Sequence, residues 1–246
     1  MDMQAITLAR AVLAAARRPV VLTGAGMSAE SGVPTFRDAL TGLWSNFDPE
    51  RLASPEGFAA DPPLVWGWYS ERRRGVLRAQ PNAGHLALAR AAAYFEQFPI
   101  VTQNVDGLHA RAGSLDVLEL HGNILRTKCF GECGFRCDDP KDLPAGEPPA
   151  CPRCGQWLRP DVVWFGELLD AVLLERAEQL AQCCDVMLVV GTSGVVYPAA
   201  ALPGRARRAG AQVIIVNPHP SELDDQAHLL IRDTAARALP MLFEPA

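Results

Sequence analysis

The sequence lacks any apolar run close to the roughly 18 consecutive residues that a membrane-spanning helix needs. The segment 1–18 is too polar for a secretory signal and has no cleavage-like end, so we expect a cytoplasmic protein without a membrane partner. An excess of basic charge is also missing, since 28 Asp and Glu outweigh 23 Lys and Arg for a formal net charge of −5. Binding to nucleic-acid phosphates requires a basic face, so we expect no nucleic-acid partner.

Internal repeats and low-complexity tails are absent as well, which leaves a globular protein. Its 246 residues suffice for one large domain, or for a large domain with a small one. The 49% of hydrophobic and 21% of charged residues are ordinary for a soluble enzyme. Some of the seven cysteines are clustered, and in a cytoplasmic protein clustered cysteines indicate a bound metal before disulfides.

Short apolar runs rich in Val, Ile and Leu alternate with helical patterns along most of the chain. The runs that predict strands are 19–23, 98–102, 115–120, 185–190, 212–216 and 228–231. The patterns that predict helices are 4–17, 83–95, 168–182, 198–209 and 234–242. Near-continuous apolar strands that alternate with helices are typical of a parallel sheet covered on both faces, so the predicted fold class is α/β.

A polar or glycine-rich turn follows four of the predicted strands, at 24–26, 103–106, 191–193 and 217–219. Ligands of open α/β sheets bind outside the carboxyl ends of the strands. Each turn alone could be an ordinary loop, but four at one edge favour a ligand cleft. Asn104 and Asp106 could hydrogen-bond a carboxamide or ribose hydroxyls, whereas the alternative is an Asx turn with Gly107.

The first of these turns, Gly24-Ala25-Gly26-Met27-Ser28-Ala29, fits the dinucleotide-binding pattern G-x-G-x-x-G/A. An ordinary dinucleotide fold would continue through a long helix into a second strand, yet Gly32 and Pro34 interrupt the helical stretch almost at once. An NAD oxidoreductase also needs an acidic residue about 20 residues further on, at the end of that second strand. Asp48 and Glu50 lie at this distance, but no strand precedes them.

The stretch 122–167 breaks the alternation and reads as an inserted module, because Cys, Gly and Pro are frequent and apolar periodicity is weak. It contains two close cysteine pairs, Cys129 with Cys133 and Cys151 with Cys154. Two such pairs suit a tetrahedral Zn²⁺ held by four thiolates. Cys137 competes with Cys133 as the second ligand, and free or redox cysteines are the alternative to a metal site. Four thiolates leave no open position, so we expect one structural zinc.

His121 stands out among the five histidines because it follows the predicted strand 115–120 and precedes Gly122, which lets a partner approach closely. It also lies just before the cysteine module, where the two parts of the molecule should meet. A histidine in this place can act as a general base near neutral pH. A strand-end histidine alone is more often structural, and only the four turns beside it favour catalysis.

The stretch 39–80 is a second irregular region, and it contains Trp66-Gly-Trp-Tyr69-Ser-Glu-Arg72. Residues three apart share a helix face, so Tyr69 and Arg72 can converge on one point. A phenol and a guanidinium aimed together suit a carboxylate, because Arg offers a two-pronged donor and Tyr adds a third hydrogen bond. The alternative is that Arg72, Arg73 and Arg74 form a solvated basic face.

Together these motifs resemble the sirtuin family, the NAD-dependent protein lysine deacylases. GAGMSAESGVPTFRD, TQNVDGLH, ELHG, the two cysteine pairs, RPDVVWFGE, GTS and VNPH occur in the order of that family and span essentially the whole chain. The resemblance implies a Rossmann-like parallel sheet with helices on both faces and an inserted small zinc-ribbon domain. The NAD-binding domain would comprise 1–38, 81–121 and 168–246, with a cofactor-loop and helical insert at 39–80 and the zinc-binding domain at 122–167.

The resemblance also assigns residues to NAD and to an acyl-lysine peptide, which would enter a cleft between the domains from opposite sides. The implied cofactor-binding residues are Gly24, Ala25, Gly26, Ala29, Phe36, Arg37, Gln103, Asn104, Val105, Asp106, Gly191, Thr192, Ser193, Asn217, Pro218, His219 and Ala235. The implied substrate-binding residues are Tyr69, Arg72, Val163, Phe165, Gly166, Glu167, Val195 and Val196, with the peptide added as a strand. The implied metal ligands are Cys129, Cys133, Cys151 and Cys154.

In the mechanism that the resemblance implies, the acyl oxygen attacks the ribose anomeric carbon and nicotinamide leaves. His121 then removes a proton from a ribose hydroxyl, and the reaction ends in free lysine and O-acyl-ADP-ribose. A loop at 32–44 that reorders would carry Phe36 to shield the sugar and Arg37 to hold phosphate. NAD would therefore be consumed and not reduced.

The pair Tyr69-x-x-Arg72 marks the sirtuin branch that removes acidic acyl groups such as succinyl and malonyl, and many bacterial members with this pair also remove acetyl. We therefore expect both activities, from a monomer that acts on acylated protein lysines. Three alternatives remain at this point: mono-ADP-ribosyl transfer on the same fold, an NAD oxidoreductase, and a zinc-ribbon adaptor without catalysis. The adaptor leaves the glycine turn and His121 unexplained.

Overall fold

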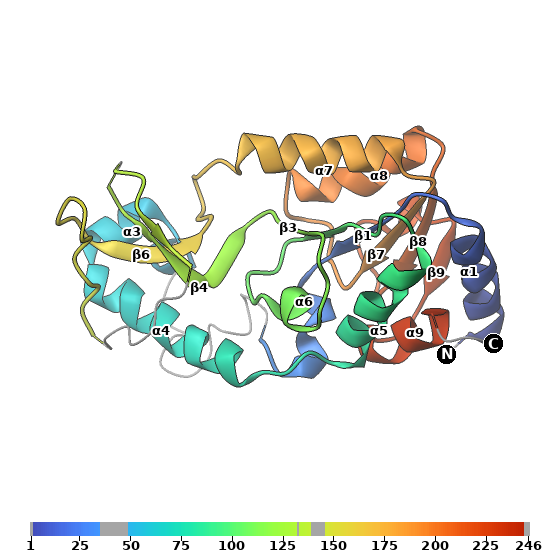
Figure 1. The fold of residues 1–246 in the computed structure, drawn as a ribbon, viewed down its shortest axis with the longest axis horizontal. Helices are drawn as coiled ribbons and strands as arrows, with labels where there is room; N and C mark the ends of the chain where they lie inside the picture. The colour runs from blue at the N-terminus through green and yellow to red at the C-terminus, as the bar shows by residue number, and fades with distance from the viewer. Residues whose placement is uncertain (1, 35–48, 132, 139–145, 244–246) are drawn as a thin grey trace.

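The computed structural model describes residues 2–34, 49–131, 133–138 and 146–243. It has a large body built on a six-stranded sheet and a smaller body built on a three-stranded sheet, at the two ends of the long axis (Figure 1). Both chain termini lie at the end of the large body (Figure 1).

The large sheet is entirely parallel, in the order β3-β2-β1-β7-β8-β9. Its strands are β1 Pro19–Thr23, β2 Ile100–Thr102, β3 Val117–Glu119, β7 Val186–Val190, β8 Gln212–Val216 and β9 Leu229–Ile231. β1 lies between β2 and β7, and all five of its residues are buried because helices cover both faces. The predicted α/β fold class is confirmed.

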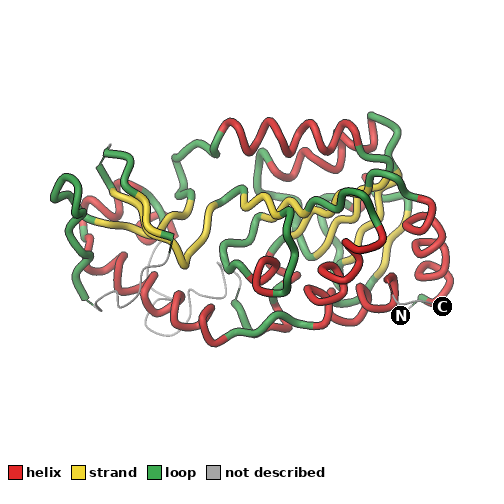
Figure 2. Tube along the Cα trace, in the orientation of Figure 1, coloured by secondary structure: helices red, strands yellow, loops and turns green. Residues whose placement is uncertain are grey.

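Helices cover the two faces of this sheet unequally (Figures 1 and 2). One apolar core joins the sheet to α1 Met3–Ala15, α5 Ala83–Ala91 and α9 Ala235–Phe243. The other joins it to α7 Ala171–Cys183 and α8 Leu202–Arg208. Side-chain oxygens of Asp2, Asn82 and Asp170 accept hydrogen bonds from the first backbone amides of α1, α5 and α7, so local caps start these helices.

The small sheet is antiparallel, in the order β5-β4-β6, with β4 Gly122–Cys129, β5 Arg136–Cys137 and β6 Leu158–Val162. Within its described part, residues 49–80, the stretch that was irregular in sequence forms three helices, α2 Pro49–Leu52, α3 Pro55–Ala60 and α4 Pro62–Arg78. Phe58 of α3 and Trp68 of α4 share one apolar core with Ile124, Val162 and Trp164 of the small sheet and the loop after it. These helices therefore pack on the cysteine module as one small body.

A short helix, α6 Leu108–Arg111, follows the turn after β2 and lies between the large body and the C-terminal end of α4. None of the helices in the described ranges combines the length and apolar character that a membrane span requires.

Candidate active site

Two glycine turns lie against each other at the carboxyl edge of the large sheet. The Gly26 amide donates to the Gly191 carbonyl at 2.8 Å, and the Gly24 amide donates to the Val190 carbonyl at 3.0 Å. A Cβ atom at Gly26 would lie 2.7 Å from the Gly191 Cα, and one at Gly24 would lie 2.7 Å from the Thr192 Cβ. These glycines are therefore required by the contact between the turns, before any ligand is considered.

Thr192 connects the other two turns, 103–106 and 217–219, to the two glycine turns. The Gln103 side-chain amide donates to its hydroxyl at 3.0 Å, and the Asn217 side-chain amide donates to its carbonyl at 2.9 Å. The Arg232 guanidinium holds the carbonyl of His219 at 3.0 Å, which braces the outer part of the fourth turn. The four turns predicted to share one edge are thus hydrogen-bonded into a single assembly.

The other predicted cofactor residues lie around this assembly. Ala25, Ala29 and Ser193 are exposed, as are Pro218 and His219. Val105 is half-buried, and its carbonyl accepts from the Ile124 amide at 2.8 Å. Ala235 is buried at the start of α9, where the Glu30 carboxylate accepts from the Ala236 amide. Phe36 and Arg37 lie outside the described residues.

Ser28 is the centre of a polar cluster that the sequence did not single out. Its hydroxyl accepts from the Asn104 side-chain amide at 3.1 Å and contacts the His85 Nε2 at 3.4 Å. The His85 Nδ1 accepts from the Asn82 amide, so the ring hydrogen is on Nε2 and points to Ser28. The Ser28 hydroxyl also hydrogen-bonds the Asp106 carboxylate. This network fixes the orientation of the Asn104 amide.

Asp106 is buried, and burial raises the pKa of its carboxyl group. Three neighbours act in the opposite direction: the Leu108 amide, which donates at 2.9 Å, the Ser28 hydroxyl and the positive charge of Arg111. The hydrogen bond to Leu108 is the Asx arrangement that the sequence allowed, so Asp106 both caps its own turn and faces the cluster.

Two further histidines are buried beside this cluster. Burial lowers the pKa of His85 to about 4 and that of His109 to about 3. The His109 Nε2 contacts the Thr23 hydroxyl at 3.0 Å, and the two imidazole rings lie with their centroids 4.9 Å apart. Both rings are therefore neutral at pH 7 and fully enclosed, which makes them structural groups. Of the other three histidines, His219 and His228 are exposed and His121 is half-buried.

His121 lies between β3 and β4, at the junction of the two bodies. Its Nδ1 lies 3.0 Å from the Gln103 carbonyl, which can only accept, so the ring hydrogen is on Nδ1 and the Nε2 lone pair is available. Burial lowers the pKa of His121, and the carbonyl partly opposes this effect. A neutral, oriented imidazole is the form that a general base needs.

The next residue, Gly122, has φ +79°, and a Cβ there would lie 2.2 Å from the Asp161 carbonyl. Glycine therefore allows the chain to leave His121 and enter β4 directly against β6. The Val163 amide donates to the His121 carbonyl at 2.9 Å, which joins the predicted peptide segment to the histidine.

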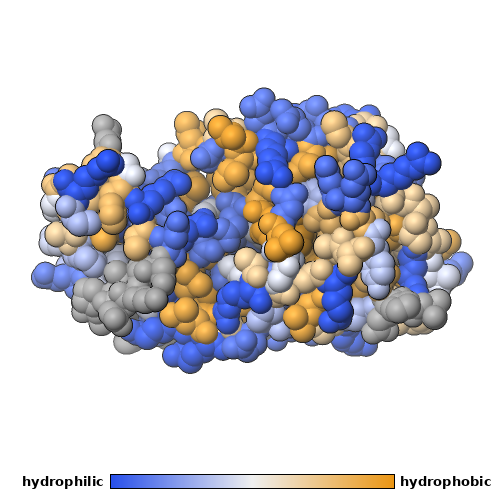
Figure 3. Space-filling view, in the orientation of Figure 1, coloured by the Kyte–Doolittle hydropathy of each residue, from blue (hydrophilic) through white to orange (hydrophobic). Residues whose placement is uncertain are grey.

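The predicted peptide-binding segments present apolar side chains to solvent. Phe165 is 52% exposed, and Val195 and Val196 are 47% and 45% exposed. Apolar atoms gather on the surface where α7 begins (Figure 3). Gly166 has φ +83°, and its turn is held by Glu167, whose carboxylate accepts from the Trp164 amide and pairs with Arg159. Glu167 therefore stabilises the turn of this segment through its own hydrogen bonds.

Tyr69 and Arg72 come together on α4, as their spacing predicts. The Tyr69 hydroxyl accepts from the Trp164 Nε1 at 2.9 Å, and the Arg72 guanidinium carbon lies 4.7 Å from the Trp68 ring centre and 5.7 Å from that of Tyr69. Burial raises the pKa of Tyr69 and lowers that of Arg72, and the proximity of the two groups opposes both shifts.

The three consecutive arginines do not form one solvated face. Arg72 is half-buried on the aromatic rings and Arg74 is exposed. Arg73 is buried and donates to the Ile124 carbonyl at 2.8 Å, which fastens α4 to β4. The alternative of a solvated basic face is therefore wrong for Arg72 and Arg73, and only Arg74 is exposed as it requires.

Four sulfur atoms form the predicted metal cluster. Those of Cys129, Cys133, Cys151 and Cys154 all lie within 4.8 Å of one another. Four thiolates at about 2.3 Å from Zn²⁺ would be about 3.8 Å apart, so this donor set fits a tetrahedral zinc. Cys137 lies on β5 outside the group, which resolves the choice in favour of Cys133.

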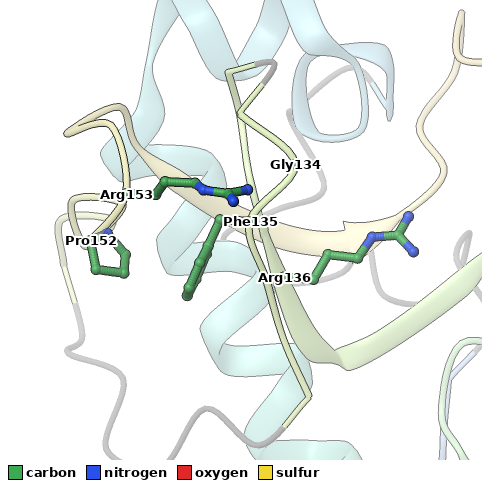
Figure 4. Close-up of a pocket in the computed structure, with 5 residues that line it drawn as sticks. All are labelled: Gly134, Phe135, Arg136, Pro152 and Arg153. Carbon is green, nitrogen blue, oxygen red and sulfur yellow. The ribbon is translucent and has the colours of Figure 1, made fainter.

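A shallow depression beside this cluster is lined by Gly134, Phe135, Arg136, Pro152 and Arg153 (Figure 4). The Arg153 guanidinium donates to the Cys133 carbonyl at 2.7 Å, so it braces the loop that carries a predicted zinc ligand. The cysteine cluster belongs to the small body, because Cys129 ends β4 and packs with Cys151 and with Leu158 of β6.

Comparison with known proteins decides the family. The model of the protein family described as "Sir2 family" matches residues 24–198. This chain is a sirtuin. It is 56% identical over 241 residues to a protein of Ralstonia nicotianae named NAD-dependent protein deacylase, covering 98% of this chain and 97% of that protein. It is 49% identical over 242 residues to NAD-dependent protein deacylase 1 of Pseudomonas aeruginosa, covering 96% of each.

A solved structure described as a Sir2 homolog–NAD complex superposes with a TM-score of 0.88 at 40% identity, over 99% of this chain and 93% of that one. The sirtuin resemblance and the two-body architecture predicted from sequence are thus confirmed. The oxidoreductase and adaptor alternatives lose their support. How the sirtuin chain divides into domains, and which residues contact ligands, stay predictions.

Proposed function

We propose that this sirtuin is an NAD-dependent protein-lysine deacylase that removes acetyl groups and, through Tyr69 and Arg72, succinyl and malonyl groups. The observation that carries the proposal is the setting of His121: its Nδ1 is fixed by the Gln103 carbonyl, and the same residue, Gln103, is tied to Thr192 of the glycine-turn assembly. The base and the cofactor turns are therefore parts of one rigid hydrogen-bonded edge. The relatives named deacylases support the reaction type.

The turns offer NAD two kinds of partner. Backbone at 24–26 and 191–193 can offer amide groups to phosphates, because the contact between the two glycine turns holds this backbone in place at the edge of the sheet. Asn104, with its side-chain NH₂ committed to Ser28, directs its amide oxygen away from that bond, toward ribose or carboxamide hydrogens. When bound, NAD supplies an electrophilic ribose carbon and nicotinamide as the leaving group.

His121 supplies the base at a defined atom. Its Nε2 lone pair can take a proton from a ribose hydroxyl, while the Gln103 carbonyl holds the Nδ1 hydrogen and steadies the imidazolium that forms. Because burial lowers its pKa, the imidazole stays in the basic form at neutral pH.

The peptide would lie between Val163–Gly166 and Val195–Val196 as an added strand. The exposed apolar side chains on both segments can enclose the lysine stem, and backbone groups can pair with the peptide backbone. Phe165 is anchored by its own amide, which donates to the Ala53 carbonyl at 2.8 Å.

Tyr69 and Arg72 suit the far end of an acidic acyl chain. The Tyr69 oxygen accepts from Trp164, so its own hydrogen can be donated to a carboxylate. The half-buried Arg72 charge lies over two aromatic rings, where a carboxylate would gain more than in water. A shorter, uncharged acetyl group needs neither of these two hydrogen bonds, so we propose that it is removed as well.

The four thiolates would hold zinc with no open coordination position, so the metal would stabilise the small body and take no part in the chemistry. The acidic composition supports our further proposal that the enzyme does not act on nucleic acids. We also propose that it acts on proteins as a cytoplasmic monomer without a membrane partner.

Product analysis tests this function. The enzyme is incubated with NAD and acetyl-, succinyl- or decanoyl-lysine peptide, and nicotinamide, peptide and ADP-ribose products are identified by mass. Equal amounts of nicotinamide, free lysine peptide and O-acyl-ADP-ribose are expected from acetyl and succinyl peptides. Formation of NADH would support an oxidoreductase instead, and ADP-ribose attached to protein would support a transferase.

A further inference from the structure

Arg111 links two parts of the molecule that the proposed function uses separately. It is the last residue of α6, which begins directly after the cofactor loop Gln103–Asp106. Its guanidinium leaves α6 and donates from Nη1 to the Val76 carbonyl at 2.9 Å and from Nη2 to the Ala79 carbonyl at 2.7 Å. Both carbonyls belong to the C-terminal end of α4.

The two hydrogen bonds are suited to this helix end. The last four carbonyls of a helix have no intrahelical donor, and the end carries a partial negative charge. One guanidinium satisfies two of these carbonyls with two of its nitrogens and places a cation at the C-terminal end of the helix. The contact therefore sets both the position and the direction of the final turn of α4.

On its other side Arg111 acts on the cofactor loop. Its charge is one of the three influences that stabilise the Asp106 carboxylate against burial. Asp106 is in turn bonded to Ser28, which holds Asn104. Arg111 is also tied to this loop through α6, because its backbone amide donates to the Gly107 carbonyl at 3.1 Å and the Asp106 carboxylate accepts from the Leu108 amide at 2.9 Å. Arg111 is thus hydrogen-bonded through its backbone to the end of the loop proposed to bind ribose and through its side chain to α4.

α4 is the helix that carries Tyr69 and Arg72, and Arg72 lies one turn before Val76. Its middle is fastened to the small body by the Arg73–Ile124 and Tyr69–Trp164 hydrogen bonds. Its C-terminal end runs toward α6 of the large body (Figure 1). Arg111 therefore holds, from the cofactor side, the helix that would read the acyl group.

We propose that Arg111 is a positioning residue that couples the cofactor loop at Asp106 to α4, and thereby sets Tyr69 and Arg72 relative to bound NAD. The identities of the two ligands rest on the proposed function. If Arg111 were only a helix cap, its loss would lower stability and slow turnover of every acyl substrate equally. If it couples the two elements, its loss breaks the response of α4 to NAD.

Hydrogen exchange of full-length protein with and without saturating NAD, without peptide, measures this response. In the wild type, NAD should slow amide exchange across 74–79 at least threefold. In Arg111→Gln the same amides should change less than 1.5-fold on adding NAD, although equilibrium dialysis finds NAD affinity within fivefold of wild type. Arg111→Lys keeps the charge but cannot span both carbonyls, and should respond partially.

Arg78→Gln is the matched control, because it removes a cation from the same helix end where Arg78 is an exposed side chain. It should respond to NAD as the wild type does. Equal protection by NAD in Arg111→Gln and wild type, or none in the wild type, would overturn the proposal. Nicotinamide release by the wild type with acetyl peptide tests the proposed function separately, so the two failures can be told apart.

Steady-state kinetics give a second readout. Arg111→Gln should raise KM for succinyl peptide at least tenfold and for acetyl peptide less than threefold, with kcat on both within threefold. In an Arg72→Met background, Arg111→Gln should no longer discriminate between the peptides. A uniform fall in kcat on both peptides would mean that Arg111 serves stability alone.

Discussion

Replacing Gly26 with alanine tests the claim that the two glycine turns are in backbone contact. The added Cβ would lie 2.7 Å from the Gly191 Cα, 2.9 Å from its carbonyl oxygen and 3.2 Å from its carbonyl carbon. All three are backbone atoms, so no flexible side chain can move away. The turn must shift, and the 2.8 Å hydrogen bond between the Gly26 amide and the Gly191 carbonyl would lengthen or break.

The cost follows from the size of the clash. Forcing one methyl group into a packed region costs about 1–3 kcal/mol, and losing a hydrogen bond adds about 1 kcal/mol. For a chain of this size, each kcal/mol lowers Tm by about 2–4 °C. Gly26→Ala should therefore lower Tm by several degrees, and it should weaken NAD binding because we propose that the same backbone holds the phosphates of NAD.

Gly75→Ala is the matched control. Gly75 lies inside α4, and nothing is within 4 Å of where its Cβ would be. Alanine is favoured over glycine in a helix by about 1 kcal/mol, so this variant should be more stable than the wild type. Thermal unfolding and isothermal titration with NAD measure both variants. If the two alanines shift Tm in the same direction, or Gly26→Ala binds NAD normally, the contact between the turns has been misread.

The remaining predictions concern the acyl pocket, the metal and pH. Arg72→Met should lower kcat/KM on succinyl peptide by roughly 30- to 150-fold, because hydrogen bonds to a charged group contribute about 2–3 kcal/mol. Tyr69→Phe should lower it more weakly, and both variants should keep acetyl turnover within a fewfold of wild type. An equal fall on both peptides would contradict the proposed acyl pocket. Metal analysis should find one zinc per chain, lost in Cys133→Ser and kept in Cys137→Ser; the reverse pattern would refute the cluster. Burial depresses the pKa of His85 from 6.5 to about 4 and that of His109 from 6.5 to about 3. As the pH falls, the unfolded chain therefore takes up these protons before the folded protein does. The stability that the two neutral rings contribute is complete above about pH 6.5, and it falls toward pH 4 by about 1.4 kcal/mol per pH unit for each histidine. Urea unfolding at pH 7, 6 and 5 measures this slope, and a flat profile would count against buried neutral rings.

The strands could be predicted because burial on both faces leaves a continuous apolar run. β1 and β8 have the predicted bounds, whereas β2 begins two residues later than predicted, after Pro99, which has no amide hydrogen to donate to a ladder. The turns were visible for a related reason, since glycine and polar residues must end such runs where the chain leaves the sheet.

What the sequence could not reveal are contacts between distant segments. α4 has no clean amphipathic pattern, because Trp66, Trp68 and Tyr69 are buried against different partners and Arg73 is buried by carbonyls of β4. The Ser28–His85 contact joins residues 57 apart in the chain. The capping box of Asn82 and His85 was a local signal that this imidazole is committed to structure.

The sequence favoured Cys133 but left Cys137 as a competing ligand for a similar reason. Both have plausible spacing from Cys129, and only the antiparallel pairing of β4 and β5 removes Cys137 from the cluster by placing it opposite Thr127. Spacing alone therefore identified the kind of site but left one of its four ligands open.

The central claim is that this chain consumes NAD to deacylate lysine with His121 as the base. The most direct measurement compares wild type and His121→Ala for nicotinamide and free lysine peptide released from NAD and acetyl peptide, together with NAD affinity. The account predicts release in the wild type only when both substrates are present, and a loss of about 100-fold or more in His121→Ala with NAD affinity within a fewfold. Near wild-type release by His121→Ala, or NADH in place of nicotinamide, would contradict it.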